Sequence, residues 1–270
     1  MSRKVDLFDS TYGNFETEVL ARVRRKTFGE DFGQNSWTTA EEFRGWVARL
    51  GLGGRSRVLE VASGSGGPAV FLAELCGARV TGIELNALGV ATARKRAAAH
   101  GVDERVTFVE ADACAKLEFP DRAFDAIVCI DSACHFADRP AVLKEWQRVL
   151  APGGSVLFTD PVVVTGPVSS EELAIRSSIG SFLFVPPMLN ERWIAEAGFE
   201  AIASEDVSAN AALVSSRWRD ARAADREALV RIEGETRFAD LQRFFDVVHR
   251  LTSERRVSRF VYFAKRRAID

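Results

Sequence analysis

Five carboxylates stand at intervals through the middle of the chain, each at the end of a short apolar run or just after one. They are Glu60, Glu84, Asp112, Asp131 and Asp160. Apolar runs of about four to eight residues are typical of buried parallel strands, whose carboxyl ends meet at one edge of a sheet. We therefore expect these acids to share one edge, where carboxylates can accept hydrogen bonds from the amine or hydroxyl groups of a ligand.

A glycine-rich turn follows the first of these runs. The stretch RVLEVASGSGGPAVF (residues 57–71) indicates a strand, a turn and a helix, with Pro68 suited to the first helical turn. Gly64 and Gly66 would let the backbone approach a ligand closely, because no Cβ intervenes. This arrangement opens a nucleotide-binding doubly wound fold. The run Gly64, Gly66, Ala69 also satisfies the loose G-x-G-x-x-A pattern of dinucleotide-binding proteins, with Glu84 placed for a ribose.

One of the three histidines is placed for chemistry. His135 lies on a loop after the fourth apolar run, at the expected ligand edge, and an imidazole can accept a proton near neutral pH. Asp160, at the end of the next run, could orient that ring and stabilise its charged form. The alternative is a structural loop histidine, or one that only orients a substrate. Adjacent side chains diverge and no further ligands are near in sequence, so no metal site is predicted at Cys134 and His135.

Length and composition limit the classes of function. The chain has 270 residues, 47% of them hydrophobic, enough for one large α/β domain with additions or for two small ones. A net charge of −2 and the absence of a basic stripe with interleaved aromatics argue against a nucleic-acid partner. There is no N-terminal apolar signal region and no apolar run near twenty residues. We expect a cytoplasmic protein with four reduced cysteines and no membrane partner.

Strands and helices are expected to alternate between residues 51 and 160, which predicts a parallel sheet with helices on both faces. Strands are predicted near 57–61, 79–83, 105–109, 124–130 and 155–160, and later at 199–207 and 255–265; helices are predicted near 68–76, 87–100, 139–149 and 189–198.

Three segments break this alternation. Residues 1–50 are predicted to be helical, with a loop at 29–37 and a helix capped by Thr38 or Thr39. Residues 161–189 contain a short helix from about Ser170. Residues 208–255 contain two amphipathic helical patterns, and the apolar stripe of 238–251 is a candidate homodimer interface.

As a set, these motifs resemble one family. Glu60 before the glycines, EADA (residues 110–113) after the third strand and LAPGGSVLFTD (residues 150–160) together resemble the class I S-adenosylmethionine-dependent methyltransferases. The resemblance covers roughly residues 57–199 and the last strand. It implies a Rossmann-like seven-stranded sheet with an antiparallel last strand, a sheet domain at 51–207 and 256–270, a helical cap at 1–50, and acceptor-side insertions or lids at 161–189 and 208–255.

The resemblance also implies how the cofactor, S-adenosylmethionine, would be held. Glu60 would hold the methionyl amine, Glu84 the ribose, and Asp112 with Ala113 the adenine. The other expected cofactor-binding residues are Ala62, Gly64, Gly66, Leu85, Asp131 and Gln34. Ala62 stands where the family often has its first glycine, and we expect only a slight change in the loop. The N-terminal segment would close over the cofactor, with Tyr12, Gln34, Asn35, Ser36 and Trp37 as candidates.

The acceptor side resembles a narrower group. SACHFADR (residues 132–139) is similar to a stretch in sugar and natural-product O-methyltransferases of the rebeccamycin type, which implies that His135 and Asp160 form the catalytic base pair. The sugar enzymes carry two adjacent histidines, and Cys134 replaces the first. In the resembled family the 161–189 insertion shapes the acceptor pocket, so Phe182, Phe184 and Met188 are candidates to line it.

The sequence therefore predicts methyl transfer to a hydroxyl, or an amine, of a small molecule in secondary metabolism. N-methylation of a small amine, of the glycine-derivative or phosphoethanolamine kind, and C-methylation stay open as alternatives. An NAD-dependent oxidoreductase and a catalytically inactive binding protein are the alternatives from other classes.

Overall fold

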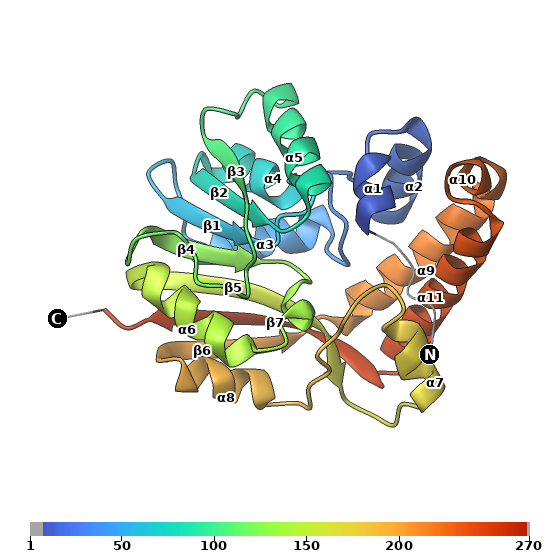
Figure 1. Ribbon diagram of the computed structural model, residues 1–270. Helices are drawn as coiled ribbons and strands as arrows, with labels where there is room; N and C mark the ends of the chain where they lie inside the picture. The colour runs from blue at the N-terminus through green and yellow to red at the C-terminus, as the bar shows by residue number, and fades with distance from the viewer. Residues whose placement is uncertain (1–7, 269–270) are drawn as a thin grey trace.

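A single open sheet lies at the centre of the molecule (Figure 1). In the computed structural model, which describes residues 8–268, seven strands follow the order β3-β2-β1-β4-β5-β7-β6. They are β1 (Arg57–Val61), β2 (Arg79–Glu84), β3 (Val106–Glu110), β4 (Phe124–Cys129), β5 (Leu150–Val164), β6 (Phe199–Asp206) and β7 (Val257–Arg266). β7 runs antiparallel to both β5 and β6, which confirms the predicted fold class. Residues 1–7 and 269–270, which fall in the predicted cap and sheet domain, lie outside the described residues.

The strand order reverses between β1 and β4. The chain first builds outward from β1 through β2 to β3, and then returns to pair β4 with the other side of β1 in parallel. In a doubly wound sheet a ligand binds beyond the carboxyl ends of the strands at such a switch point. The end of β1, where Glu60 pairs with Gly82 of β2 and Val128 of β4, is therefore the expected place for a site.

Helices cover both faces of the sheet (Figure 1). One face carries α3 (Ala40–Leu50), α4 (Gly67–Cys76) and α5 (Ala87–Ala99), and the other carries α6 (Arg139–Val149) and α8 (Leu189–Glu196). Because neighbouring strand residues point to opposite faces, Val58 packs with Trp46 of α3, whereas Leu59 belongs to the cluster around Trp146 of α6. Burial on both faces explains why these strands are apolar runs without alternation.

A third group of helices lies beyond the carboxyl edge of the parallel strands (Figure 1). It contains α9 (Ser208–Ala224), α10 (Arg226–Glu233) and α11 (Glu235–Ser253), with α1 (Phe8–Gly13) and α2 (Glu18–Phe28) nearby. α2, α9 and α11 share an apolar cluster that includes Phe28, Val214 and Phe244. The apolar stripe of 238–251 is therefore used within the chain, where it joins α11 to α9 and to the N-terminal segment.

β5 is longer than the sequence predicted. It runs from Leu150 to Val164, whereas the sequence predicted a strand near 155–160. The added first part contains an irregularity, where Gly153 has a φ of 75° and the register against β4 shifts. Past Asp160 the strand continues because it pairs with β7, as in Val163 with Ser258. Asp160 therefore does not stand at the end of its strand.

Local caps position the elements that border this edge. The Asn86 side chain accepts hydrogen bonds from the backbone N–H groups of Leu88 and Gly89 and so begins α5. Thr39 accepts from the N–H of Glu42 at the start of α3, as predicted. α7 (Ser170–Arg176) begins with a capping box formed by Ser169 and Glu172.

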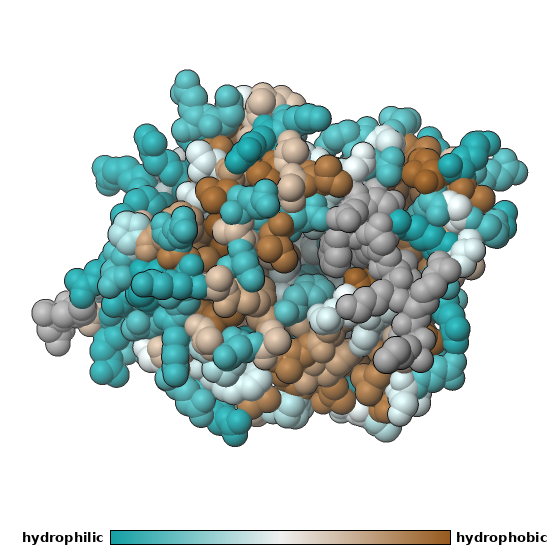
Figure 2. Space-filling model, viewed as in Figure 1, coloured by the Kyte–Doolittle hydropathy of each residue, from teal (hydrophilic) through white to brown (hydrophobic). Residues whose placement is uncertain are grey.

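Polar side chains cover much of the outer rim of the molecule on the face in Figure 2, with apolar residues in patches between them. Within residues 8–268, none of the helices combines the length and the apolarity needed to cross a bilayer.

Candidate functional site

A cavity of about 430 Å³ opens at the carboxyl ends of β1, β2 and β4. Of the residues predicted to act here, nine line it: Glu60, Ala62, Gly64, Glu84, Leu85, Asp112, Ala113, Asp131 and His135. Gly66, Gln34 and Asp160 are not among the described lining residues. The cavity continues from the glycine turn to side chains of η1 (Ala133–His135), α7, α9 and α11, so it has a sheet side and a helical side.

Glu84 closes the glycine turn. Its Oε2 accepts a hydrogen bond from the backbone N–H of Gly64 at 2.9 Å, and its Oε1 accepts one from the N–H of Asn86, also at 2.9 Å. Each carboxylate oxygen can accept more than one hydrogen bond, so Glu84 keeps capacity for a ligand hydroxyl. The carboxylate thus joins the turn after β1 to the start of α5.

The two predicted glycines serve different purposes. Gly64 has a φ of 54° and lines the cavity, where an added Cβ would lie 3.0 Å from the Tyr12 hydroxyl. Gly66 has a φ of 79°, and its added Cβ would lie 2.7 Å from the Cβ of Ala93 and 2.8 Å from a ring carbon of Phe108. The prediction that Gly66 admits the ligand is therefore not borne out: Gly66 allows α4 and α5 to pack closely.

Ala62 carries backbone strain. Its φ is 57°, in the left-handed region that glycine adopts freely and that crowds a Cβ. The loop therefore keeps the backbone path expected for a glycine, and the alanine is accommodated at a cost of roughly 1–2 kcal/mol.

Glu60 is a buried acid whose charge is poorly compensated. It is 2% exposed, and its Oε2 has no hydrogen-bond partner among the described residues. Burial, and then the nearby charge of Glu84, raise the pKa of Glu60 well above its ordinary value, although a hydrogen bond from the Ala69 backbone opposes the shift. A cation entering the cavity would relieve both effects, so this end of the site is suited to an ammonium group.

The rest of the sheet side of the cavity contains exposed polar and apolar residues. Asp112 is exposed, and its Oδ1 accepts a hydrogen bond from the N–H of Cys114 at 2.8 Å. Leu85 is 66% exposed and presents an apolar surface to the cavity. These two residues and Ala113 form an edge suited to a flat ring with a polar rim.

The N-terminal loop borders the cavity, but not through Gln34. That side chain is fully buried, accepts a hydrogen bond from the N–H of Phe32 and donates one to the carbonyl of Glu30, so it stabilises its own loop. The predicted cofactor contact of Gln34 is therefore not supported. The other candidates for closure do line the cavity: Tyr12, Asn35, Ser36 and Trp37.

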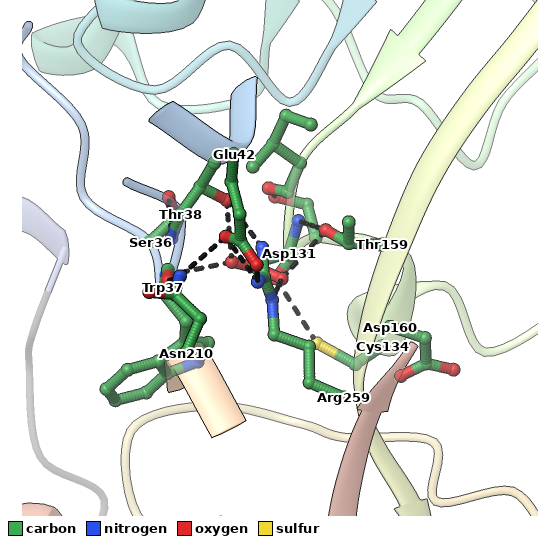
Figure 3. A network of polar contacts seen from close by, with 12 residues as sticks. Ser36, Trp37, Thr38, Glu42, Asp131, Cys134, Thr159, Asp160, Asn210 and Arg259 are labelled. Carbon is green, nitrogen blue, oxygen red and sulfur yellow. Dashed lines mark hydrogen bonds and ion pairs between the residues drawn. The ribbon is translucent and has the colours of Figure 1, made fainter. Parts of the chain in front are cut away.

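Asp131 is held by the protein itself (Figure 3). Its Oδ1 lies 2.8 Å from Nε of Arg259, and its Oδ2 accepts a hydrogen bond from the N–H of Trp37 at 2.8 Å. Arg259 also binds Glu42 of α3 at 2.9 Å and the Thr38 hydroxyl at 2.6 Å. These contacts tie the N-terminal loop to β4 and β7, so Asp131 positions the loop although it also lines the cavity.

The hydrogen bond of the His135 ring defines its tautomer, and this tautomer can act as a base. Its Nδ1 lies 3.0 Å from the carbonyl oxygen of Ser181. A carbonyl can only accept, so Nδ1 carries the proton and Nε2 carries the lone pair. Burial lowers the pKa of His135 and the positive charge of Arg176 adds to this, while the Ser181 contact and Asp160 act in the opposite direction. The ring is therefore neutral near pH 7 and can accept a proton at Nε2.

The structure does not bear out the predicted pairing of Asp160 with His135. Asp160 is fully buried, and its Oδ2 lies 2.5 Å from Nη1 of Arg139 and accepts a hydrogen bond from Asn190 at 3.0 Å. The cause is the length of β5, which carries Asp160 into the interior of the sheet. The carbonyl of Ser181, on the loop after α7, takes the place expected for Asp160 at Nδ1 of His135.

On the helical side, Phe182 lines the cavity as predicted, and its ring centroid lies 4.6 Å from that of His135. Phe184 and Met188 are not among the described lining residues: Phe184 packs in an apolar cluster, and Met188 is 67% exposed. Sequence reasoning missed several lining residues from three helices and the loop after α7: Arg176, Ile179, Trp218, Phe244 and Phe245. Helical periodicity marked the two phenylalanines as apolar but did not reveal which surface they face.

The fold and the site together define a class. A doubly wound sheet with an antiparallel last strand and an acid-lined cavity at its switch point is the Rossmann-like methyltransferase architecture. Residues 59–158 match a family model described as a methyltransferase domain. The chain therefore contains a domain of the class I, S-adenosylmethionine-dependent methyltransferases.

Individual relatives differ in the reactions their names describe. The chain is 36% identical over 162 residues to 27-O-demethylrifamycin SV methyltransferase of Amycolatopsis mediterranei (strain S699), covering 59% of either protein. It is 30% identical over 217 residues to phosphoethanolamine N-methyltransferase 3 of Arabidopsis thaliana, covering 80% of this chain and 43% of that protein. The matches thus span about half the length of these curated relatives.

A solved structure shows the same fold over nearly the whole chain. Phosphoethanolamine N-methyltransferase 2 of Haemonchus contortus, in complex with phosphomonomethylethanolamine and S-adenosylhomocysteine, superposes with a TM-score of 0.79. The two proteins are 23% identical, and the match covers 98% of this chain and 61% of that one.

Proposed function

We propose that this protein transfers a methyl group from S-adenosylmethionine to a hydroxyl group of a small molecule. The observation that carries the proposal is Glu60, a buried acid on the cavity wall whose Oε2 lacks a hydrogen-bond partner in the described chain. The amine of a methionyl group is the cation that would complete it. The bound cofactor would supply an electrophilic methyl group on a sulfonium.

Four further residues would hold the cofactor. Glu84 would accept hydrogen bonds from the ribose hydroxyls while it keeps the turn closed. Asp112 and Ala113 would meet the adenine, and Leu85 would cover one face of a ring. Each of these residues lines the cavity, so together they would contact the polar and the apolar parts of one nucleoside.

His135 would remove the proton from the acceptor hydroxyl. It is neutral, its Nε2 carries the lone pair, and it lines the same cavity as Glu60. A hydroxyl becomes a much better nucleophile as its proton leaves, whereas an amine can react without such help. The presence of a base favours O-methylation over the N-methylation named for the Arabidopsis relative.

The cytoplasmic location and the homodimer predicted from the sequence remain proposals.

The test is a transfer assay with S-adenosylmethionine carrying an isotopically labelled methyl group. Hydroxylated natural products, including polyketides, and small amines would be offered to the wild type and to His135→Ala. His249→Ala is a matched control, because Nδ1 of His249 also lies 3.0 Å from a backbone carbonyl, that of Ala212, but the ring does not line the described cavity.

Loss of the base is expected to slow transfer to hydroxyl acceptors by about 10²–10⁴-fold. The His249 variant should keep wild-type turnover, and both variants should keep their affinity for S-adenosylhomocysteine. Turnover of His135→Ala close to that of the wild type would rule out the proposed base and leave N-methylation as the better description.

A further inference from the structure

Arg176 is a buried cation on the helical side of the cavity. It is the last residue of α7, it is 2% exposed, and it lines the cavity. Within residues 8–268 its guanidinium makes no hydrogen bond or ion pair to another side chain or to the backbone. A guanidinium presents five N–H donors, so its polar atoms are available to something that enters the cavity.

The groups around this guanidinium are aromatic, neutral or already paired. The guanidinium carbon lies 4.7 Å from the ring centroid of Phe182 and 5.4 Å from that of Phe244. Three acidic groups act on it electrostatically. Burial raises the pKa of the Cys134 thiol, so this group is neutral, and Asp131 and Asp160 are engaged by Arg259 and Arg139. Aromatic faces attract a cation but accept no full set of hydrogen bonds, so the charge of Arg176 stays uncompensated.

The other buried arginines of the described chain all form ion pairs. Each of them pairs with a carboxylate: Arg24 with Asp31, Arg139 with Asp160, Arg222 with Glu233, and Arg259 with Asp131 and Glu42. Buried charges are as a rule paired, because desolvation of a lone charge is costly. Among the buried arginines of residues 8–268, Arg176 is the one without a carboxylate partner, and it lines the cavity of the candidate site.

The helix that carries Arg176 is fixed from its other end. Glu172 completes the capping box with Ser169 and lies 2.7 Å from Arg256 of the chain segment before β7. Arg250 of α11 also reaches Glu172, at 3.3 Å. α7 is therefore held against α11 and β7, and the guanidinium is presented to the cavity by a rigid support.

We propose that Arg176 binds an anionic group, a carboxylate or a phosphate, on the methyl acceptor. This inference rests on the proposed function. A planar guanidinium suits the two oxygens of such a group and can bind them bidentately. Phe182, Phe244 and Phe245 line the same part of the cavity, so the rest of the acceptor is apolar or aromatic. His135 lines the cavity as well, so the reacting hydroxyl and the anionic group belong to one molecule.

The test uses three probes of one shape: naphthoate, naphthyl phosphate and the neutral naphthamide. Each is titrated by calorimetry into the wild type saturated with S-adenosylhomocysteine, and then into Arg176→Met and Arg176→Lys. The wild type is expected to bind at least one anionic probe about tenfold or more tighter than the amide. That preference should vanish in Arg176→Met and survive in part in Arg176→Lys. The tighter of the two anions identifies the acceptor group as a carboxylate or a phosphate.

Three results would overturn the inference. One is equal binding of acids and amide, or no binding of either acid, by the wild type. Another is a preference for anions that persists in Arg176→Met. The third is a tenfold or greater loss of affinity for S-adenosylhomocysteine in Arg176→Met, which would assign the guanidinium to the cofactor. Failure of the wild type to bind S-adenosylhomocysteine would instead refute the proposed function.

A stability comparison separates ligand binding from a structural role. Arg176→Met replaces an uncompensated buried cation by an apolar side chain among aromatic rings, so its melting temperature should equal or exceed that of the wild type. Arg139→Met is the matched control. It leaves the buried carboxylate of Asp160 without its cation, so this variant should melt well below the wild type. A comparable drop for Arg176→Met would show that this guanidinium serves the fold and would overturn the inference.

Discussion

The guanidinium of Arg259 on β7 lies 2.8 Å from the carboxylate of Asp131, which follows β4, and both side chains are almost fully buried. Through Glu42 and Thr38 the same arginine reaches α3 and the N-terminal loop. Segments more than 200 residues apart in the sequence, such as Thr38 and Arg259, therefore meet at one ion pair beside the cavity. The position of the loop that borders the site depends on it.

Arg259→Met should accordingly destabilise the protein. The substitution leaves Asp131 and Glu42 without their cation, and breaking a buried pair costs about 3–5 kcal/mol. Urea unfolding of the variant and of the wild type measures this. Arg267→Met is the control, because Arg267 is 82% exposed in its pair with Glu200 and should contribute about 0–1 kcal/mol. Equal losses in the two variants would contradict the role given to Arg259.

Glu60→Gln should stabilise the protein and weaken cofactor binding. The pKa of Glu60 is raised on folding, so the folded state holds more protons than the unfolded state above pH 4.5, and stability falls as the pH rises through that range. The amide removes this loss, and we expect a gain of about 1–3 kcal/mol near pH 8. This gain in stability should vanish below pH 4.5, where the carboxyl of Glu60 and the amide that replaces it are both neutral. Affinity for S-adenosylhomocysteine should fall about tenfold or more.

Urea unfolding at the two pH values and calorimetric titration check both halves of this prediction. A less stable variant at the higher pH, or unchanged affinity for S-adenosylhomocysteine, would contradict the account of Glu60 as an acid that awaits a cation.

The pH dependence of transfer should report His135. Burial lowers the pKa of this ring below its ordinary value of 6.5, so the base is neutral above that pH and becomes protonated only in more acidic solution. The acidic limb of the rate profile should therefore have its midpoint below pH 6.5. Initial rates under saturating substrate test this. A midpoint at or above 6.5 would mean that another group controls the rate or that the ring is not desolvated in the working enzyme.

Ala62→Gly should make the protein more stable. At a φ of 57° glycine avoids the crowding of the alanine Cβ, and this outweighs the greater freedom of glycine in the unfolded chain. The expected gain is about 0.5–1 kcal/mol. Ala69→Gly in α4 is the opposite control and should lose about 1 kcal/mol or more. Thermal unfolding of both variants decides the point, and a loss in Ala62→Gly would show that the turn needs the methyl group.

The strands and much of the sheet side of the cavity could be predicted because their signals are local. An apolar run followed by an acid marks Glu60 and Glu84, and both line the cavity. Pairing over long distances in the sequence is not local. β5 continues past Asp160 because Val163 meets Ser258 of β7, and no pattern near Asp160 reveals that partner.

The direction of side chains within loops and helices could not be predicted from the sequence either. Gln34 and Asn35 are neighbours, but only Asn35 lines the cavity, because the Gln34 amide is engaged within its own loop. Arg176 has no motif around it, and its significance comes from the partner it lacks. The position of Arg176 depends on the packing of α7 against α11, which no local sequence pattern reveals.

Calorimetric titration with S-adenosylhomocysteine, and in parallel with NAD, tests the central claim most directly. The wild type should bind S-adenosylhomocysteine and not NAD. Glu84→Ala should weaken that binding about tenfold or more, because charge-assisted hydrogen bonds contribute about 1.5–3 kcal/mol, while Glu84→Gln should lose less since it keeps one acceptor. Binding of NAD alone, or of neither ligand, would contradict the assignment of this cavity to S-adenosylmethionine.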